Sequence, residues 1–363
     1  MLVPVFCGQS CPEKCQCARL KWTCGGQKIN DTTLLEIART GDPLTAKELL
    51  LKDNLITHFP AKAFSKFTNL EKIDLGQNLL RKPPANVSVY IPSVSNFSID
   101  RNKISKISKE DFIGYQNLTY LDIFNNAISE LETGIFQNVP KLQTLVAETN
   151  KIKVLKNGTL DNAKELISVS FASNGLERIE RDTFTAATKL KILWLDNNSL
   201  ISLPEGVFRN QQNLSELYLE DNHLTTFRRE WFDSPAVEQV EVGLENNPLH
   251  CDCALYNAIQ YFAIGNGKFE IYGNCETPAN LKGDDIHFDI YEKNKLGCTA
   301  CSLNECENNS TCQVMNATSY NCSCSEKYHG KFCQFENACL IMKPAKTMEP
   351  VRKLKTPSNV TAV

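Results

Sequence analysis

The sequence predicts a solenoid of α/β type, in which short parallel strands form one concave β-sheet and disulfide-bonded caps close both ends. Two observations predict this fold. An asparagine recurs at one constant interval through eight successive copies, preceded in each copy by alternating apolar residues. The sixteen cysteines, in contrast, lie only in residues 7–24, 251–275 and 298–339, outside the repeated region. The eight regularly spaced asparagines are Asn54, Asn78, Asn102, Asn126, Asn150, Asn174, Asn198 and Asn222.

Length and composition limit the possible classes of protein. A chain of 363 residues is too long for one ordinary domain, so we expect two or three units. The 42% of hydrophobic residues can fill a core, which excludes a disordered or collagen-like chain. The net charge of −3 provides no general attraction to nucleic acid, and no run of 18 apolar residues is present to span a membrane. We therefore expect no nucleic-acid partner, and membrane anchoring only through sequence not present here.

Cysteines and glycosylation motifs together indicate an extracellular protein. Clustered cysteines can ligate zinc in a cytosolic protein, but this chain also carries twelve N-x-S/T motifs, which favour the secretory pathway and disulfides. Residues 1–10 lack the basic start and long apolar stretch of a signal peptide, so we interpret them as a truncated leader or flanking segment. Ten of the twelve motif asparagines are predicted glycosylation sites, and the other two are Asn309 and Asn321. The predicted sites are Asn30, Asn86, Asn96, Asn117, Asn157, Asn197, Asn213, Asn308, Asn316 and Asn359.

Each repeat has the frame L-x-x-L-x-L-x-x-N-x-L. Alternating apolar residues place two side chains on the inner face of a short strand, and one repeat alone cannot bury that face. Where the strand turns away, backbone N–H and C=O groups lose their ladder partners, and an asparagine amide offers both a donor and an acceptor to them. A helical repeat would need a 3.6-residue period, which this spacing does not show. One copy of the frame is held by Leu118, Leu121, Ile123, Asn126 and Ile128.

The sequence also predicts a ninth strand and a curved stack. Val242 and Leu244 hold the apolar positions of the ninth strand, which leads after one extra residue to Asn247. A second apolar column in the same register fills the wider outer side of each coil and curves the stack. Repeat 2 interrupts this column with Ser88, after two adjacent prolines, so we expect its outer side to be irregular. The column consists of Phe64, Phe112, Phe136, Leu160, Phe184, Phe208 and Phe232.

Over residues 46–247 this frame resembles the extracellular leucine-rich repeat family, which implies a horseshoe of eight repeats plus a final strand. Residues 11–45 resemble the family's N-terminal cysteine cap. Four cysteines allow three pairings, and the resemblance implies one of them, Cys11–Cys17 with Cys15–Cys24.

Residues 248–299 resemble the family's C-terminal cysteine cap. The motif that carries this resemblance is N-P-L-H-C-D-C, which runs from Asn247 to Cys253 and is followed by two further cysteines. The resemblance implies Cys251–Cys275 and Cys253–Cys298 disulfides, and a short helix over residues 255–264.

Residues 300–334 resemble an epidermal-growth-factor-like (EGF-like) module, because their six cysteines follow the pattern C-x4-C-x5-C-x9-C-x-C-x8-C. The residues before the first of these cysteines are not acidic, so we predict no calcium site. Residues 335–363 resemble a linker and the start of a fibronectin type III domain. Cys7 and Cys339 lie beyond opposite caps, too far apart to pair, and we expect each to lack its partner within this chain. For residues 300–334, the resemblance to an EGF-like module implies the disulfides Cys301–Cys312, Cys306–Cys322 and Cys324–Cys333.

The sequence shows no constellation of catalytic residues. The five histidines are scattered, and no phosphate-binding glycine loop, zinc-protease helix or nucleophile elbow is present. Cys298-x-x-Cys301 has the spacing of a redox motif, but the family frameworks assign each cysteine to a different module. We therefore predict that the protein is not an enzyme and uses no cofactor and no metal.

The concave face is predicted to bind a protein. Nine strands give a sheet about 38 Å long and about 20 Å wide, close to the roughly 800 Å² that one partner contributes to a standard interface. Its outward positions hold 13 acidic and 5 basic residues, which favours a basic partner across repeats 4 to 8. Large aromatic residues beside charges are typical of binding hot spots. The predicted partner-binding residues are Tyr120, Asp122, Phe124, Glu148, Trp194, Asp196, Tyr218 and Glu220.

The order of modules resembles membrane-anchored proteins that trap transforming-growth-factor-beta ligands. It also resembles secreted guidance ligands of Roundabout receptors. We therefore predict an extracellular module that captures a protein ligand or receptor in cell-surface signalling, as a secreted protein or the ectodomain of a cell-surface protein. The alternatives are a guidance-type ligand and a structural matrix component that binds collagen or sulfated glycans.

Overall fold

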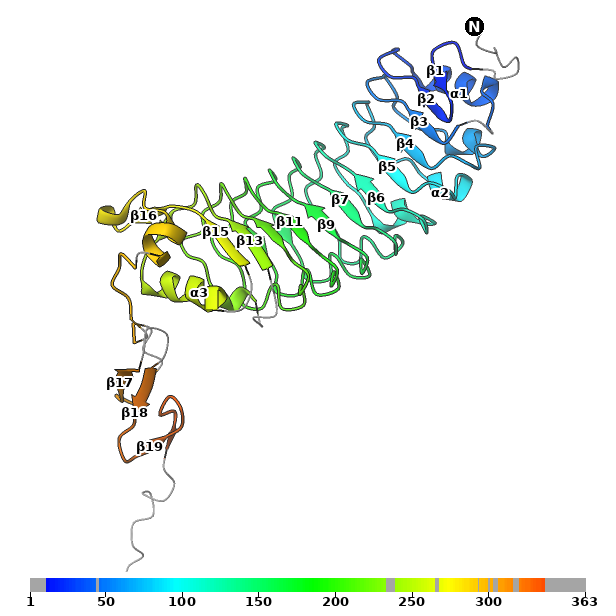
Figure 1. Ribbon diagram of the computed structural model, residues 1–363. Helices are drawn as coiled ribbons and strands as arrows, with labels where there is room; N and C mark the ends of the chain where they lie inside the picture. The colour runs from blue at the N-terminus through cyan, green and yellow to red at the C-terminus, as the bar shows by residue number, and fades with distance from the viewer. Residues whose placement is uncertain are drawn as a thin grey trace, which may run out of the picture. The chain divides into compact units, whose positions relative to one another are not determined.

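A computed structural model of the chain describes residues 11–43, 46–232, 239–264, 268–292, 294–299, 301–302, 306–315 and 320–336. They fall into two compact units that divide between Leu296 and Gly297 (Figure 1). The expected leader at residues 1–10 lies outside the described residues, as does the expected fibronectin start beyond residue 336. The same holds for Cys7, Cys339, Asn316 and Asn359.

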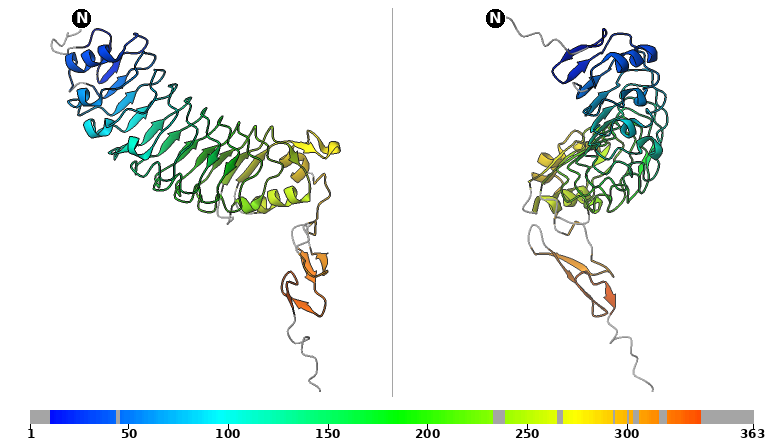
Figure 2. Two further views of the ribbon diagram at one scale, coloured as in Figure 1. Left: turned by 180° about the vertical axis from the view of Figure 1, so that it is seen from behind. Right: turned by 90° about the vertical axis from the view of Figure 1, so that its right-hand side faces the viewer.

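The first unit is a curved stack of coils with one sheet of twelve strands on its inner side (Figures 1 and 2). Nine of the strands are those that the repeat predicted, and all nine are parallel. The leucine-rich repeat fold class is thereby confirmed. The nine strands are β3 (Glu48–Leu50), β4 (Lys72–Asp74), β5 (Asn96–Ser98), β6 (Tyr120–Asp122), β7 (Thr144–Val146), β9 (Ser168–Ser170), β11 (Ile192–Trp194), β12 (Glu216–Tyr218) and β13 (Gln239–Gly243).

Three further strands that the repeat did not predict extend the sheet into the caps. β1 (Gln16–Ala18) and β2 (Lys21–Thr23) form an antiparallel hairpin that pairs with β3, and β15 (Lys268–Tyr272) pairs in parallel with β13. Both ends of the repeat sheet are therefore covered by paired backbone rather than left as open edges.

The core of the stack is built from the predicted apolar columns. The middle residue of each three-residue repeat strand, such as Leu121 in β6 or Leu193 in β11, is fully buried, as is Val242 in β13. On the outer side, the ring centroids of Phe184 and Phe208 are 5.8 Å apart, and those of Phe208 and Phe232 are 5.3 Å apart. These large side chains space the coils more widely on the outer side than on the sheet side, which curves the stack.

The repeated asparagines bond backbone groups where the strands turn away, as predicted, and they also connect neighbouring coils. Asn126 donates from Nδ2 to the carbonyl oxygens of Ile123 (3.1 Å) and Ile99 (3.0 Å), and its Oδ1 accepts from the Ile104 N–H at 3.0 Å. Ile99 and Ile104 belong to the preceding coil, so one amide satisfies backbone groups of two coils. Only 9% of Asn126 is exposed.

Short elements line the outer side of the coils. Repeat 2 differs from the others, as the sequence predicted: a helix, α2 (Val87–Tyr90), stands there, and the buried Ser88 hydroxyl donates to the Ile113 carbonyl at 3.1 Å. The remaining outer elements are η1 (Ala61–Phe64), η2 (Lys109–Phe112), η3 (Arg229–Trp231) and the strand pair β8 (Val154–Leu155) and β10 (Arg178–Ile179).

The N-terminal cap contains the Cys11–Cys17 and Cys15–Cys24 disulfides and one helix, α1 (Asp31–Thr40). The Asn30 side chain accepts from the Thr33 N–H at 3.0 Å and so caps the helix. Gly41 ends the helix against Trp22, where an added Cβ would lie 2.0 Å from the indole ring. The Trp22 ring thus packs directly on the helix end and closes the core.

The C-terminal cap contains the Cys251–Cys275 disulfide, and Cys253 and Cys298 are also disulfide-bonded. Its helix, α3 (Cys253–Ile264), begins two residues before the expected start, because Asp252 Oδ1 accepts from the Ala254 and Leu255 N–H groups at 3.0 and 2.9 Å. The other elements of this cap are β14 (Leu249–His250), β16 (Cys275–Thr277), η4 (Ala279–Leu281) and the π-helix η5 (Ile286–Glu292).

The second unit is held together by three disulfides, Cys301–Cys312, Cys306–Cys322 and Cys324–Cys333. These are the pairs that the family resemblance implied. Its strands form two antiparallel pairs, β17 (Thr311–Val314) with β18 (Tyr320–Ser323) and β19 (Tyr328–His329) with β20 (Phe335–Glu336). No helix in the described parts of the chain is both long and apolar enough to cross a membrane.

Candidate binding surface

The eight predicted partner-binding residues lie on the strands or in the turns directly after them, and all are half-buried. Seven of them form two groups, and Glu148, in the turn after β7, lies between the groups, where burial and the charges of Asp196 and Asp122 raise its pKa. Tyr120 and Asp122 belong to β6, whereas Trp194 and Tyr218 belong to β11 and β12. Three strand spacings, about 14 Å in all, separate β6 from β11. The two intervening strands, β7 and β9, present only small side chains outward: Thr144, Val146, Ser168 and Ser170.

The second group is centred on two stacked rings, which we call the aromatic pair: Trp194 and Tyr218. Trp194 and Tyr218 are direct neighbours in the parallel register of β11 and β12. Their ring centroids are 5.8 Å apart, and the ring planes differ by 7°. The Tyr218 hydroxyl donates to Glu216 Oε2 at 2.9 Å, and this hydrogen bond raises the pKa of Tyr218 to about 12. The pair is therefore a fixed, neutral aromatic surface on the concave side.

Beside the aromatic pair stands a column of carboxylates, Asp196, Glu220 and Glu245, which we call the carboxylate column. Each lies two residues before the repeated asparagine of its coil, so the three are stacked on adjacent coils. One oxygen of each, Asp196 Oδ1, Glu220 Oε2 and Glu245 Oε2, is buried without a hydrogen-bond partner among the described residues. Gly243 makes room for Glu220, because a Cβ there would lie 1.9 Å from Glu220 Oε1.

Burial and repulsion by neighbouring charges disfavour the ionised forms of Glu220 and Asp196. Burial, followed by the charges of Glu245, Asp196 and Asp221, raises the pKa of Glu220 to about 7. Burial and the charge of Asp221 raise the pKa of Asp196 above its usual range. An incoming cation would offset both the lost hydration and the repulsion, so the column is suited to a positively charged group.

The first group lies in a cavity of about 530 Å³ on the concave side, and its charges are largely matched within the protein. The Arg101 guanidinium lies 4.8 Å from the Phe124 ring centroid, and its Nη1 is 2.9 Å from Asp100 Oδ2. The Ser98 hydroxyl donates to Asp100 Oδ1 at 2.9 Å and is 3.2 Å from Asp122 Oδ2. Because Arg101 covers Phe124 and pairs with Asp100, this group is less available to a partner than the second group.

Several residues that shape this surface were not among the eight predicted partner-binding residues. Glu216 and Glu245 occupy outward frame positions, so the frame itself could have identified them. Gly243 and Arg101 act through contacts between side chains of neighbouring coils, which the repeat frame does not describe.

Two predicted glycosylation sites lie on the concave side. Asn96 is half-buried in β5 and lines the cavity of the first group, so a glycan there would cover that group. Asn197 is exposed, and its Nδ2 donates to Ser173 Oγ at 3.0 Å on the preceding coil, whereas Tyr218 lies on the following one. The other predicted sites in the described residues are exposed: Asn30, Asn86, Asn117, Asn157, Asn213 and Asn308.

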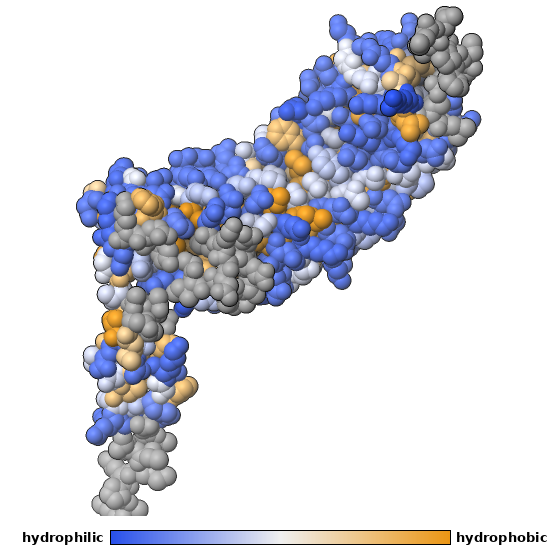
Figure 3. Space-filling view, viewed as in Figure 1, coloured by the Kyte–Doolittle hydropathy of each residue, from blue (hydrophilic) through white to orange (hydrophobic). Residues whose placement is uncertain are grey.

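The surface in Figure 3 is mainly hydrophilic, and its hydrophobic residues are gathered in small separate patches. Within the described ranges, no group of three or more histidine, cysteine, aspartate and glutamate side chains is arranged to hold a metal ion. The stacked rings and the unpartnered carboxylate oxygens are therefore the features of this surface that point to binding chemistry.

Comparison with known proteins agrees with the fold. Residues 92–152 and 188–249 match the leucine rich repeat family. A complex of latrophilin 3, Unc5D and the leucine-rich repeat region of FLRT2 contains a chain with 21% identity and a TM-score of 0.54, over 75% of this chain and 96% of that one. Human 5T4, or trophoblast glycoprotein, matches with 22% identity and a TM-score of 0.54, over 76% of this chain and 95% of that one.

A leucine-rich repeat protein of Leptospira interrogans is 28% identical over 52% of this chain, with a TM-score of 0.45. This chain spans 45% of that protein's length. The repeat match and the concave parallel sheet lead to one conclusion: the chain carries leucine-rich repeats and has the leucine-rich repeat fold.

Proposed function

We propose that this protein is an extracellular binding module that captures a basic protein ligand or receptor on its concave face. The contact is centred on the aromatic pair and the carboxylate column. The single observation that carries the proposal is the set of three adjacent carboxylates whose buried oxygens lack partners, next to two stacked rings. The protein acts by binding, without catalysis and without a cofactor.

An arginine of the partner suits this surface best. A guanidinium group can stack on an aromatic ring while it donates a charge-assisted hydrogen bond to a carboxylate oxygen. Trp194 and Tyr218 supply the ring surface, and Glu220 supplies a carboxylate beside it. Trp, Tyr and Arg are the residues most enriched at binding hot spots.

The comparisons support a protein partner. FLRT2 is described in a complex with latrophilin 3 and Unc5D, which are proteins. A sulfated glycan is less favoured, because the outer-loop lysines are partly neutralised: Lys153 lies 2.8 Å from Glu177, and Lys156 lies 3.8 Å from Glu130.

We place the function in cell-surface signalling of the growth-factor-trapping type. The three disulfides and two strand pairs of the second unit support its assignment as an EGF-like module. Capped repeats followed by such a module resemble vasorin, and a segment of Slit proteins offers the alternative of a secreted guidance ligand. Exposed N-x-S/T motifs support a glycoprotein that is secreted or displayed at the cell surface.

The test is capture of partners from extracellular medium by the immobilised protein, followed by affinity measurement with the captured partner. Each aromatic hot spot contributes about 2 kcal/mol or more, so the double variant W194A/Y218A should lose at least roughly 100-fold in affinity. The matched control is V146A/S170A, which changes the same frame position on β7 and β9. Full affinity in W194A/Y218A would refute the proposal.

A further inference from the structure

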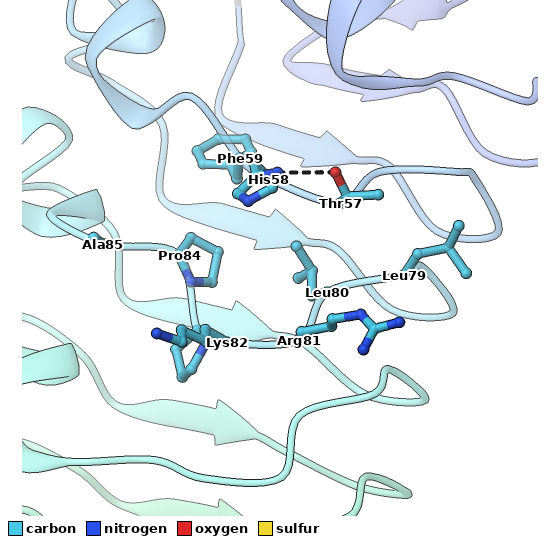
Figure 4. A pocket seen from close by; sticks show the side chains of 10 residues that line it. Thr57, His58, Phe59, Leu79, Leu80, Arg81, Lys82, Pro84 and Ala85 are labelled. Atoms are coloured by element: carbon cyan, nitrogen blue, oxygen red, sulfur yellow. Dashed lines mark hydrogen bonds between the residues drawn. The ribbon is translucent and has the colours of Figure 1, made fainter.

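A second cavity of about 610 Å³ lies on repeats 1 and 2, where the chain has left the concave sheet (Figure 4). Its volume falls within the roughly 300–1,000 Å³ typical of small-molecule pockets. We call it the repeat-2 cavity. It exists because repeat 2 departs from the regular path: Pro83 and Pro84 precede α2, and Ser88 replaces the outer phenylalanine.

The wall of the repeat-2 cavity is apolar. Phe59 contributes from repeat 1, and Leu79, Leu80, Pro83 and Pro84 contribute from repeat 2. Figure 4 shows Phe59 and His58 facing Leu80 and Pro84 across the opening. Proline carries no N–H group, so this stretch of wall presents fewer backbone donors than ordinary chain does.

The rim of the cavity is basic. Arg81 and Lys82 are exposed, and neither forms an ion pair or hydrogen bond with any residue in the described ranges. His58 also lies at the rim, and its Nδ1 is 2.9 Å from Thr57 Oγ1 and 3.3 Å from Asp31 Oδ2. Two cations are therefore available beside an apolar wall, while the nearby carboxylate of Asp31 is already occupied.

We propose that the repeat-2 cavity binds a small amphiphilic anion. The apolar body of the ligand, such as an acyl chain, lies against Phe59, Leu79 and the two prolines. Its carboxylate or sulfonate head contacts Arg81 at one side of the opening or Lys82 at the other, since Figure 4 shows the two side chains pointing in opposite directions. A small ligand is favoured over a long peptide because the cavity spans only two coils. This site is separate from the concave face, so its test is independent of the test of the proposed function.

The test uses dodecanoate, with direct calorimetric titration into the full chain with its disulfides intact. Dodecyltrimethylammonium carries a similar chain with a cationic head, and acetate carries the head without the chain. We expect dodecanoate to bind, and the other two to bind at least about tenfold more weakly, because the site needs both an apolar body and an anion.

Two variants separate the rim from the wall. R81Q/K82Q removes the cations and should weaken dodecanoate binding about 10- to 100-fold, the range for hydrogen bonds to charged groups. L79S removes part of the apolar wall and should also weaken dodecanoate binding. L79S should fold, since Ser199 holds the same frame position five repeats later.

The matched control is K103Q/K106Q, which removes two cations from the corresponding loop of repeat 3, where Lys106 holds the frame position that Lys82 holds in repeat 2. It should leave dodecanoate binding within about twofold of the unmodified protein. Three results would overturn the proposal: no dodecanoate binding, equal binding of the cationic amphiphile, or unchanged binding in R81Q/K82Q. Binding of an acidic peptide without binding of dodecanoate would also overturn it, because it would assign the surface to a macromolecule.

Discussion

Replacing Asn126 by alanine should destabilise the solenoid by an amount that its hydrogen bonds allow us to calculate. Asn126 Oδ1 accepts the hydrogen bond of the buried Ile104 N–H, so N126A leaves this donor unsatisfied at a cost of about 1–3 kcal/mol. The Ile99 and Ile123 carbonyls each retain a bond from the neighbouring asparagine, Asn102 or Asn150. Losing one bond at each costs about 0.5–1.5 kcal/mol. The total is about 2–6 kcal/mol.

The assay is urea denaturation together with hydrogen exchange of the Ile104 amide, since a repeat protein can open locally before it unfolds globally. Gln116→Ala is the control, because Gln116 is exposed on the preceding coil and its side chain makes no hydrogen bond within the described ranges. N126D is a second test: aspartate keeps the acceptor for the Ile104 N–H, but a carboxylate oxygen takes the place of the Nδ2 donor against the Ile99 and Ile123 carbonyl oxygens. Its folded-state pKa should be raised, so its deficit should shrink as the pH falls and protonation restores a donor. Equal stability of N126A and Q116A would refute the reasoning.

Three further predictions concern the caps and the carboxylate column. G41A should destabilise the N-terminal cap by about 1–3 kcal/mol, because its Cβ would meet the buried Trp22 ring; an unchanged melting temperature and near-ultraviolet circular dichroism would contradict this. E220Q should stabilise the protein at pH 8 and make no difference at pH 4. The folded-state pKa of Glu220 is raised from 4.5 to about 7, so the ionised carboxylate costs stability progressively as the pH rises through that window. Thermal melts across this range test it, and parallel profiles for the two proteins would count against it. C251S/C275S opens a disulfide that joins positions with a sequence separation of 24 and should cost about 3 kcal/mol. Hydrogen exchange should then show lost protection in α3 while the central coils stay protected; uniform protection throughout would be the contrary result.

The repeated coils were predictable because one frame recurs with little variation. Strand positions, the asparagine contacts and the outer aromatic column all follow from its constant interval. The caps were less predictable, because their residues stand outside the frame. The strands β1, β2 and β15 form by pairing with the ends of the solenoid, and no local sequence pattern predicts this pairing. The helix α1 did leave a local signal, in the Asn30 cap and in Leu34 and Ile37 on its buried face.

The candidate site was predictable as a set of outward positions, but not as a chemical surface. The constant interval of the frame places Trp194 beside Tyr218, and the structure shows their rings stacked. The frame does not reveal that Arg101 covers Phe124 on the next coil, and so removes that ring from the available surface. Nor does it reveal that Gly243 leaves space for Glu220, since both effects depend on side-chain conformation between coils.

The place of the extra residue in the last coil bears on how such a chain can change its length during evolution. Glu216 of β12 pairs with Glu241 of β13, one position farther along the chain than the interval that pairs Ile192 with Glu216. Asn247 likewise accepts from the Leu224 N–H at a sequence separation of 23, whereas Asn222 accepts from the Leu200 N–H at a separation of 22. The insertion therefore falls between Leu224 and Glu241, ahead of Val242 and Leu244, and not between the strand and Asn247, where the sequence suggested it. One inserted residue ahead of the strand thus leaves the strand pairing and the asparagine contact of the last coil intact, so such a chain can gain residues between an asparagine turn and the next strand. Engineered loops should accordingly be grafted on the outer side.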